Sequence, residues 1–339
     1  MSFLNEYFAS LLDGFLNPQK RLFVGYIATA LFIALGWLLF SGNKRAPSKV
    51  SQALAHLFSK KVWWSKSAKL DYQIILGNRL FLLLFSPLLI SQLAISSGLF
   101  LLLAEHLPSR PTFLSSWNTF SVSLLFTSVY FVIDDFARFL LHFMMHRLPF
   151  LWAFHKVHHS AETMTPFTVL RTHPVEMVLF SLRTIAVQSI SIALFVFFLG
   201  DRLTLVTVFS ASLFAFIFNL VGANLRHSHI PLHYPKWLER LIISPAQHQI
   251  HHSIESRHHD KNFGVALSFW DRCFGSFLYS EPKENLNFGL KNQQHFRYGV
   301  ISAYSEPFFD IYKMLMRRLA QLSSVVPTFI SMKFRGVEK

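Results

Sequence analysis

The residues of this 339-residue sequence that are best suited to chemistry are its histidines. Fourteen of the 17 lie between His142 and His259, and eight of these form three clusters. One cluster has the spacing H-x-x-x-H, and two have the spacing H-x-x-H-H. The clusters are His142 and His146; His155, His158 and His159; and His248, His251 and His252. Residues three and four apart on a helix share one face, so we expect each cluster to aim two or three imidazoles at one point.

Together the three clusters predict a metal centre that holds two ions. Imidazole nitrogens bind iron, zinc and copper. Eight imidazoles are too many for one ion, whereas two ions with four or five nitrogen ligands each account for the number. One H-x-x-H-H cluster alone is weak support for a metal site, but two of them with an H-x-x-x-H pair upstream are strong support.

The elements that position these clusters are predicted to be membrane helices. Hydrophobic residues make up 52% of the sequence and charged residues only 15%, whereas a typical soluble domain has about 25% charged residues. Five apolar runs are nearly free of charge, and at about 1.5 Å per residue they approach the roughly 30 Å thickness of a bilayer core. They are residues 22–40, 80–104, 111–133, 184–200 and 203–225. The single cysteine, Cys273, excludes a disulfide framework and a thiolate metal cluster.

The predicted fold is an all-α integral membrane protein. It has four to five transmembrane helices arranged in hairpins, and a cytoplasmic helical cap that carries the histidine-rich two-metal site. Lys and Arg concentrate at 42–79 and after Arg226, which places these segments and residues 142–175 on the cytoplasmic side. All three histidine clusters then lie on one side of the membrane. The net charge of +14 fits basic loops that face an anionic leaflet, and we expect no nucleic acid partner.

Three motifs carry a resemblance to a known family. HFMMH at 142–146, HKVHHS at 155–160 and HQIHHS at 248–253 resemble the three histidine boxes of the fatty acid hydroxylase/sterol desaturase superfamily. The flanking segments SAETMTPFTVLRTHPVE and HHDKNFGVALSFWDRCFGSF strengthen the resemblance, which covers roughly residues 135–278. The layout is most similar to alkylglycerol monooxygenases and bacterial sterol desaturase-like proteins.

The resemblance implies a membrane-bound, non-haem di-iron oxygenase that uses two iron ions and dioxygen. Such an enzyme hydroxylates or desaturates a membrane lipid, for example a sterol, a fatty acyl chain or an ether lipid. We expect its electrons to come from a separate donor, either a b-type cytochrome or a ferredoxin-like reductase system, because the sequence shows no phosphate-binding loop or electron-carrier domain. We expect a multi-pass protein with its active site at the cytoplasmic face, in a bacterial inner membrane rather than the endoplasmic reticulum.

The resemblance also assigns roles to residues. It implies that the clustered histidines bind metal and that a further ligand comes from RHSHIPLH at 226–233, where His227 is the first candidate and His229 the second. The implied ligands are His142, His146, His155, His158, His159, His227, His229, His248, His251 and His252. Metal-bound histidines usually donate their other N–H to a carboxylate or carbonyl. The residues expected to support the ligands in this way are Asp135, His173, His233, Asp260 and Asn262.

Three regions are expected along the chain. Residues 1–79 form an N-terminal span and a basic cytoplasmic loop, with the N-terminus on the outer side. Residues 80–305 form the membrane-embedded catalytic domain, and residues 306–339 form an amphipathic tail. In that tail, apolar residues such as Phe308 and Leu315 alternate with Lys and Arg, which is typical of an interfacial membrane helix or of a surface helix on the cytoplasmic domain.

Three other functions remain open. A membrane b-type cytochrome needs only two histidines that face each other from two spans. A metal transporter is expected to spread Asp and His along its spans rather than at their ends. A zinc-dependent hydrolase needs a general base, for which the sequence offers Glu162 or Asp260. The dense clusters at the ends of the apolar runs favour the oxygenase.

Overall fold

The computed structural model describes residues 3–40, 49–85, 91–107, 117–199, 213–281, 286–291 and 299–334, with side chains up to residue 322. These residues form α-helices and short 3-10 helices (η), two isolated β-bridges and no strand. The helices are α1 (Phe3–Leu16), α2 (Val24–Phe40), α3 (Val50–Leu57), α4 (Lys60–Trp63), α5 (Lys66–Phe85), α6 (Gln92–His106), α7 (Thr119–Arg147), α8 (Pro149–His159), η2 (Pro166–Leu170), α9 (Pro174–Leu199), α11 (Leu213–Leu220), η4 (Ala223–His227), α12 (Lys236–Glu239), α13 (Pro245–His251), η5 (Ser256–His258), α14 (Phe269–Cys273) and α15 (Val300–Phe334). The predicted all-α class is confirmed for this part of the chain.

One helix among the described residues, α9, is long and apolar enough to cross a membrane. The apolar helix α2 is shorter, at 17 residues. The start of the third apolar run, at 111–116, and the hairpin with the first half of the fifth run, at 200–212, lie outside the described residues. The number of spans and the cytoplasmic position of the cap therefore stay predictions.

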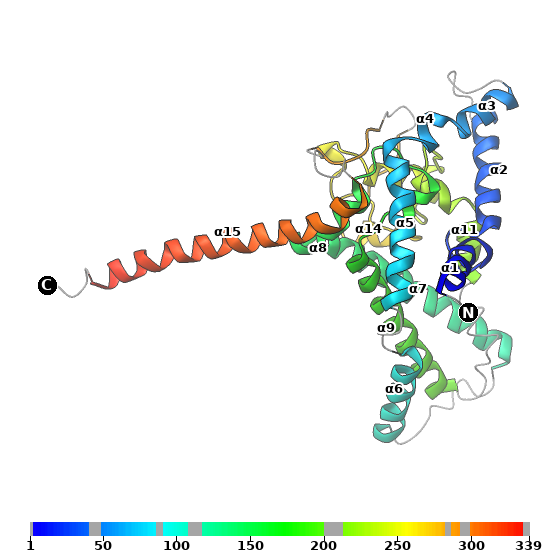
Figure 1. Ribbon diagram of the computed structural model, residues 1–339. Coiled ribbons are helices and arrows are strands. Elements are labelled where there is room, and N and C mark those ends of the chain that lie inside the picture. Colours follow the sequence, from blue (N-terminus) through cyan, green and yellow to red (C-terminus); the bar gives the residue numbers. More distant parts are fainter. Residues whose placement is uncertain are drawn as a thin grey trace.

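The helix α7 joins two parts of the molecule (Figure 1). At the lower end of the view, α6 packs on α9 and α9 packs on α7, which gives a bundle of long helices. The C-terminal end of α7 enters the upper part, where it meets α8 and where α13 packs on η4. The histidine-bearing elements all belong to this upper part.

The chain turns sharply between α7 and α8 because of its local sequence. α7 ends at Arg147, and Leu148 adopts an extended conformation before Pro149. A proline disfavours helical backbone in the residue before it, and its fixed φ suits the first position of a new helix. The helix α13 begins in a similar way, with Ser244 as its cap and Pro245 as its first residue. These starts fix the direction of two histidine-bearing helices.

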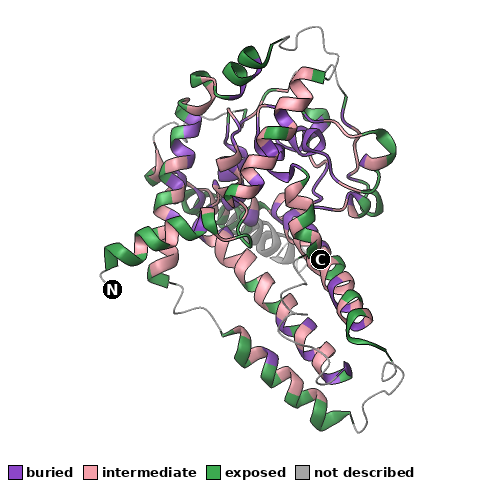
Figure 2. Ribbon diagram, turned by 90° about the vertical axis from the view of Figure 1, so that its right-hand side faces the viewer, coloured by how far each residue is buried: buried purple, intermediate pink, exposed green. Residues whose placement is uncertain are grey.

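Burial differs between the two parts (Figure 2). The upper part holds a dense set of buried polar side chains, many of them histidines. In the bundle, large apolar side chains such as Leu93, Phe120, Leu124 and Ile190 are exposed. An extensive exposed apolar surface marks a region that contacts lipid or another protein.

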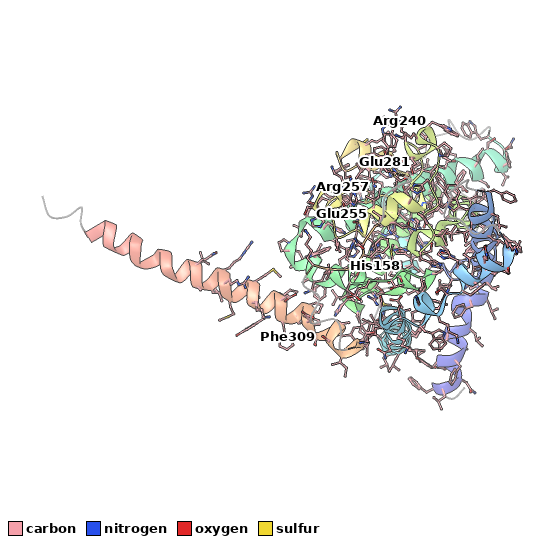
Figure 3. All side chains as sticks on the ribbon, turned by 90° about the horizontal axis from the view of Figure 1, so that it is seen from above. His158, Arg240, Glu255, Arg257, Glu281 and Phe309 are labelled. Carbon is pink, nitrogen blue, oxygen red and sulfur yellow. The ribbon has the colours of Figure 1, made fainter. Side chains whose placement is uncertain are left out.

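The long helix α15 extends away from the rest of the molecule (Figures 1 and 3). Its first turns pack on α8 and α5, where Ala303 is fully buried in a cluster with Val157 and Ile74. Farther along, apolar side chains such as Phe309 and Leu319 are exposed. The predicted boundary between residues 305 and 306 falls inside this continuous helix.

Candidate metal centre

Nine histidines from distant parts of the chain come together in two groups. The first group contains His142, His146, His155, His159 and His251. The second group contains His158, His227, His248 and His252. Within each group, the nitrogens that could bind a metal lie within 4.8 Å of one another. Nine of the ten predicted ligands are thus assembled into two sites of five and four imidazoles.

The two H-x-x-H-H clusters are each divided between the groups. In α8, His155 and His159 belong to the first group and His158 to the second. At α13 the division is reversed, since His248 and His252 belong to the second group and His251 to the first. Each cluster thus aims two imidazoles at one point, as expected, and each H-x-x-H-H cluster gives its third imidazole to the other group. Successive residues on a helix are about 100° apart, so neighbouring histidines can serve two different sites.

Hydrogen bonds from outside the groups fix the orientation of several imidazoles. The Nδ1 of His142 donates to the carbonyl of Phe263 at 2.8 Å, and the Nδ1 of His251 donates to the carbonyl of Lys261 at 2.8 Å. The Nδ1 of His155 donates to a Glu176 carboxylate oxygen at 2.9 Å. Each of these rings then carries its proton on Nδ1 and leaves an Nε2 lone pair that faces the group. This is the usual support for a metal-bound histidine.

The inward nitrogens of the first group have no partner among the described residues. The Nε2 atoms of His146, His155, His159 and His251 are buried without a hydrogen bond. Most buried polar atoms in proteins have a hydrogen-bond partner. Four convergent lone pairs without one fit a bound cation, so the residues present suit a metal ion.

The second group is packed even more closely. The Nε2 atom of His227 lies 3.1 Å from that of His158 and 3.0 Å from that of His248, and the Nε2 atoms of His248 and His252 are 3.2 Å apart. Lone pairs at this distance repel each other unless a proton or a cation lies between them. Imidazoles that bind one ion at about 2.1 Å place adjacent nitrogens roughly 3 Å apart. The spacing fits one metal ion held by these four imidazoles.

Burial also keeps these imidazoles in the form that binds metal. It lowers the pKa of His251 to about 3, although the hydrogen bond to Lys261 opposes the shift. It lowers the pKa of His159 and His252 well below the usual value. A neutral imidazole is the metal-binding form, so the groups do not need to release protons near neutral pH.

Two predicted supporting residues act through the backbone of a turn. Asp260 and Asn262 have φ values of 60° and 57°, the left-handed region that Asp and Asn tolerate better than most residues. Between them lies Lys261, whose carbonyl accepts the His251 hydrogen bond. The Asn262 amide donates to the carbonyl of Gln247 on α13, which ties the turn to the helix that bears His251.

The loop after the third cluster is held by two buried aspartates. Asp135 accepts hydrogen bonds from the backbone N–H of Ala266 at 2.9 Å and from Trp270 Nε1 at 3.0 Å. Asp271 accepts from the backbone N–H of Phe263 at 2.7 Å. The structure thus places the Asp135 carboxylate on the loop rather than on a histidine, and both residues fix the segment whose carbonyl holds His142.

Three other predicted residues lie outside both groups. The 3-10 helix η4 ends at His227, and the extended Ser228 turns the chain away, so that the Nε2 of His229 donates to the carbonyl of His56 at 3.2 Å. The structure does not bring His229 to the metal groups. His173 donates from Nε2 to the carbonyl of Tyr304, and His233 bonds with the hydroxyl of Ser280.

Sequence reasoning missed the residue that most directly supports a histidine. Glu176 is 2% exposed and pairs with His155, whereas the only residue of the THPVE segment among the predicted supporting residues is His173. The rule that ligating histidines prefer a carboxylate partner pointed to it, because it is the acidic residue of that motif. The carbonyls of Lys261 and Phe263 carried no signal in the sequence, since every residue has one.

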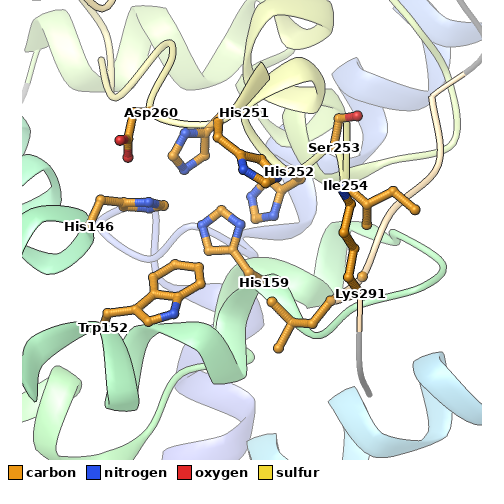
Figure 4. A pocket seen from close by; sticks show the side chains of 12 residues that line it. His146, Trp152, His159, His251, His252, Ser253, Ile254, Asp260 and Lys291 are labelled. Carbon is orange, nitrogen blue, oxygen red and sulfur yellow. The ribbon is translucent and has the colours of Figure 1, made fainter. Parts of the chain in front are cut away.

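A cavity of about 290 Å³ opens on the first group (Figure 4). His146, His159 and His251 form one wall, and the Trp152 ring lies 4.9 Å from the ring of His146. The remaining lining includes Asp260, His252, Ser253, Ile254, Leu290 and Lys291. A molecule in this cavity can reach the first group, and it meets both apolar and charged side chains.

Residues 127–276 match the sequence model of the fatty acid hydroxylase family. This part of the chain is similar to the fatty acid hydroxylase family. It contains all nine grouped histidines together with Asp135, Glu176 and Asp271. The resemblance inferred from the histidine clusters is therefore confirmed.

The chain is also similar to curated proteins. An alkylglycerol monooxygenase of Caenorhabditis elegans is 27% identical over 166 residues, which are 48% of this chain and 29% of the relative. An ornithine lipid hydroxylase of Rhizobium tropici is 26% identical over 177 residues, 52% of this chain and 48% of the relative. A Delta(7)-sterol 5(6)-desaturase of Gibberella zeae is 28% identical over 156 residues, 45% of this chain and 42% of the relative. The chain spans less than half the length of each of these relatives, and no solved structure matches it.

Proposed function

We propose that this protein is a membrane-bound, non-haem di-iron oxygenase that hydroxylates or desaturates a lipid. The observation that carries the proposal is the assembly of nine histidines into two adjacent groups whose inward nitrogens lack partners or crowd one another. The relatives support it, because their names describe a lipid monooxygenase, a lipid hydroxylase and a sterol desaturase.

The two groups would hold one iron ion each. Bound iron supplies the oxidation by dioxygen of an unactivated C–H bond, which acid–base side chains cannot achieve. The chain's own part is to fix the ligands. Glu176 and the carbonyls of Phe263 and Lys261 hold imidazole protons on Nδ1, so that Nε2 is free in each ring. The Trp152 ring, 4.9 Å from the ring of His146, adds an aromatic face to the cavity beside the first group.

The substrate is proposed to be a lipid with a polar end near its reacting carbon. The cavity beside the first group is bordered by Asp260 and Lys291 as well as by Leu290, which suits a carbon close to a headgroup. Exposed apolar side chains on α6, α7 and α9 suit a multi-pass arrangement in a bilayer. We further propose that the histidine-bearing part faces the cytoplasm of a bacterial inner membrane, and that a separate b-type cytochrome or ferredoxin-like system delivers electrons.

A membrane b-type cytochrome and a metal transporter are the other candidates. A bis-histidine haem site needs two facing imidazoles with room for a porphyrin between them. In the described part of the chain, the Nε2 atoms of His227 and His248 are only 3.0 Å apart, which leaves no such room. A transport path needs ligands along the spans, whereas the grouped histidines belong to the upper part. The oxygenase is the better supported function.

Isotope labelling tests the proposal. The iron-loaded protein is incubated with a chemical or protein reductant, labelled dioxygen and total membrane lipid, and the lipids are analysed by mass spectrometry. Label in a lipid product supports hydroxylation, and an unlabelled product with one more double bond supports desaturation. A haem absorption band in the purified protein, or no oxygen consumption with any lipid class, would contradict the proposal.

A further inference from the structure

A buried ion pair links the second histidine group to a helix outside the family match. Arg171 and Asp71 are 1% and 0% exposed, and Arg171 Nε donates to Asp71 Oδ1 at 2.6 Å. Asp71 lies on α5, which precedes the matched residues 127–276. Two buried charges are costly unless they pair closely and further bonds satisfy their other atoms. Those further bonds indicate what the pair holds in place.

The guanidinium and the carboxylate join three elements. Arg171 Nη2 donates to the carbonyl of Ser67 on α5 at 2.6 Å, and Nη1 donates to the hydroxyl of Ser160 at 3.1 Å. The Thr168 hydroxyl of η2 donates to Asp71 Oδ2 at 2.7 Å. The pair therefore ties α5 to the end of α8 and to the segment that follows it.

The same residue constrains His158 from two directions. The carbonyl of Arg171 accepts a hydrogen bond from His158 Nδ1 at 3.3 Å. Ser160, which the guanidinium also holds, directly follows the histidines of α8, and its hydroxyl donates to the carbonyl of Val157 at 2.7 Å. The positions of the His158 ring and of the end of α8 thus depend on the position of Arg171. The ion pair with Asp71 fixes the position of Arg171.

We infer that Asp71 and Arg171 are positioning residues of the second histidine group, and that α5 is part of the metal centre. The inference rests on the proposed function, because it takes this group as a metal site. The pair does not reach the inward nitrogens of the group. It acts through His158, whose Nε2 lies 3.1 Å from that of His227.

Metal binding by the purified apo protein tests the inference without any need for turnover. Co²⁺ is the probe, because its visible absorption reports imidazole sites as they fill. We expect the parent to bind in two steps, one for each histidine group. Asp71→Asn keeps the volume of the side chain and removes its charge. This substitution should weaken the Co²⁺ affinity of the second group by about 10- to 100-fold and leave the Co²⁺ affinity of the first group unchanged.

A matched control separates positioning from general stability. Asp134 forms a partly buried ion pair, with Arg183 Nη1 at 2.6 Å, and this pair joins α7 to α9. Asp134→Asn should lower the thermal midpoint but keep both Co²⁺ steps. Loss of the second step in both variants, at matched loss of stability, would overturn the inference.

A double substitution guards against a variant that fails to fold. Asp71→Leu with Arg171→Met replaces the pair by apolar side chains, a change that often preserves stability. The double variant should fold and still bind Co²⁺ weakly in the second group. Full recovery of both steps would overturn the inference, whereas a parent that binds no Co²⁺ would overturn the proposed function together with it.

Discussion

The two histidine groups differ in what surrounds them. The first group borders the cavity of about 290 Å³ through three of its five histidines, and the carboxylate of Glu176 supports it. The second group contributes only His252 to that cavity. Its Nε2 atoms crowd to between 3.0 and 3.2 Å, and the carbonyl of Arg171 supports it.

This difference suggests a division of labour between two sites built from the same residue type. A substrate in the cavity reaches the first group directly. The second group is enclosed, so its four imidazoles would hold an ion that a substrate in the cavity does not reach directly. The negative charge of Glu176 raises the basicity of the His155 imidazole more than a carbonyl partner would, so His155 should bind a metal ion more strongly. The second group has no such carboxylate partner at His158, whose Nδ1 donates to a carbonyl.

Removal of metal should have the largest effect and should occur in two phases. Because the first group opens on the cavity, a chelator should take its ion quickly and the enclosed ion slowly. Activity should vanish in the fast phase. The thermal midpoint should fall further in the slow phase, since bound ligand stabilises the folded state. Metal content, turnover and thermal unfolding are measured at intervals after the chelator is added. Loss of both ions at one rate would contradict the expected difference in accessibility between the two groups.

Single histidine substitutions should come next. His251→Ala and His248→Ala each remove one proposed ligand, and both should lower turnover by more than about 100-fold, because the loss of an outer partner of a ligand already costs about 10- to 100-fold. The groups differ in rescue: added imidazole should restore part of the activity of His251→Ala, which lines the cavity, but not that of His248→Ala.

The control for these variants is His229→Ala. His229 was predicted as a ligand, but its Nε2 donates to the carbonyl of His56. Turnover and metal content should stay near those of the parent. Equal rescue of His251→Ala and His248→Ala by imidazole would show that both groups are equally open.

Loss of the Glu176 charge should have a smaller effect, and it should affect the first histidine group only. Glu176→Gln keeps an oxygen that can accept the His155 hydrogen bond at 2.9 Å but removes the buried charge. Turnover should fall by about 10- to 100-fold, and metal affinity should weaken in the first group only. Glu162→Gln, at an exposed position, is the matched control. An equal loss of metal affinity in both groups would mean that the Glu176 charge affects the two histidine groups together.

The sequence predicted which histidines come together because their spacing on helices is a local property. Nine of ten predicted ligands are grouped, and the tenth, His229, differs because the chain leaves η4 at Ser228. The division of each H-x-x-H-H cluster was not predictable, since it depends on how α8 and α13 face each other. The spacing of the histidines in the sequence does not determine the packing angle between these two helices.

Supporting residues were harder to predict than ligands. Asp135 is two helical turns before His142, yet its carboxylate meets the loop at Ala266, because the loop brings free N–H groups to that side of α7. Asp71 lies 100 residues from Arg171, and no local pattern joins them. The membrane arrangement is a prediction from apolar runs, with α9 as the one described helix that meets the length and apolarity of a span.

The smallest expected effect concerns Asp260, at the rim of the cavity. Its side chain is 43% exposed and pairs with Arg147 at 3.2 Å, and surface pairs of this kind contribute about 0–1 kcal/mol. Asp260→Asn keeps a residue that tolerates a φ of 60° and loses only the charge, so turnover should change by less than about twofold.

Asp260→Val is the informative partner of that variant. A β-branched residue in the left-handed region costs roughly 1–2 kcal/mol, so the turn should shift and move the carbonyl of Lys261 away from His251. Turnover and first-group metal affinity should then fall several-fold more than in Asp260→Asn, with the second group unchanged. Steady-state kinetics and Co²⁺ titration of both variants provide the measurement. Equal effects of the two substitutions would mean that the Asp260 carboxylate, rather than the shape of the turn, supports the first group.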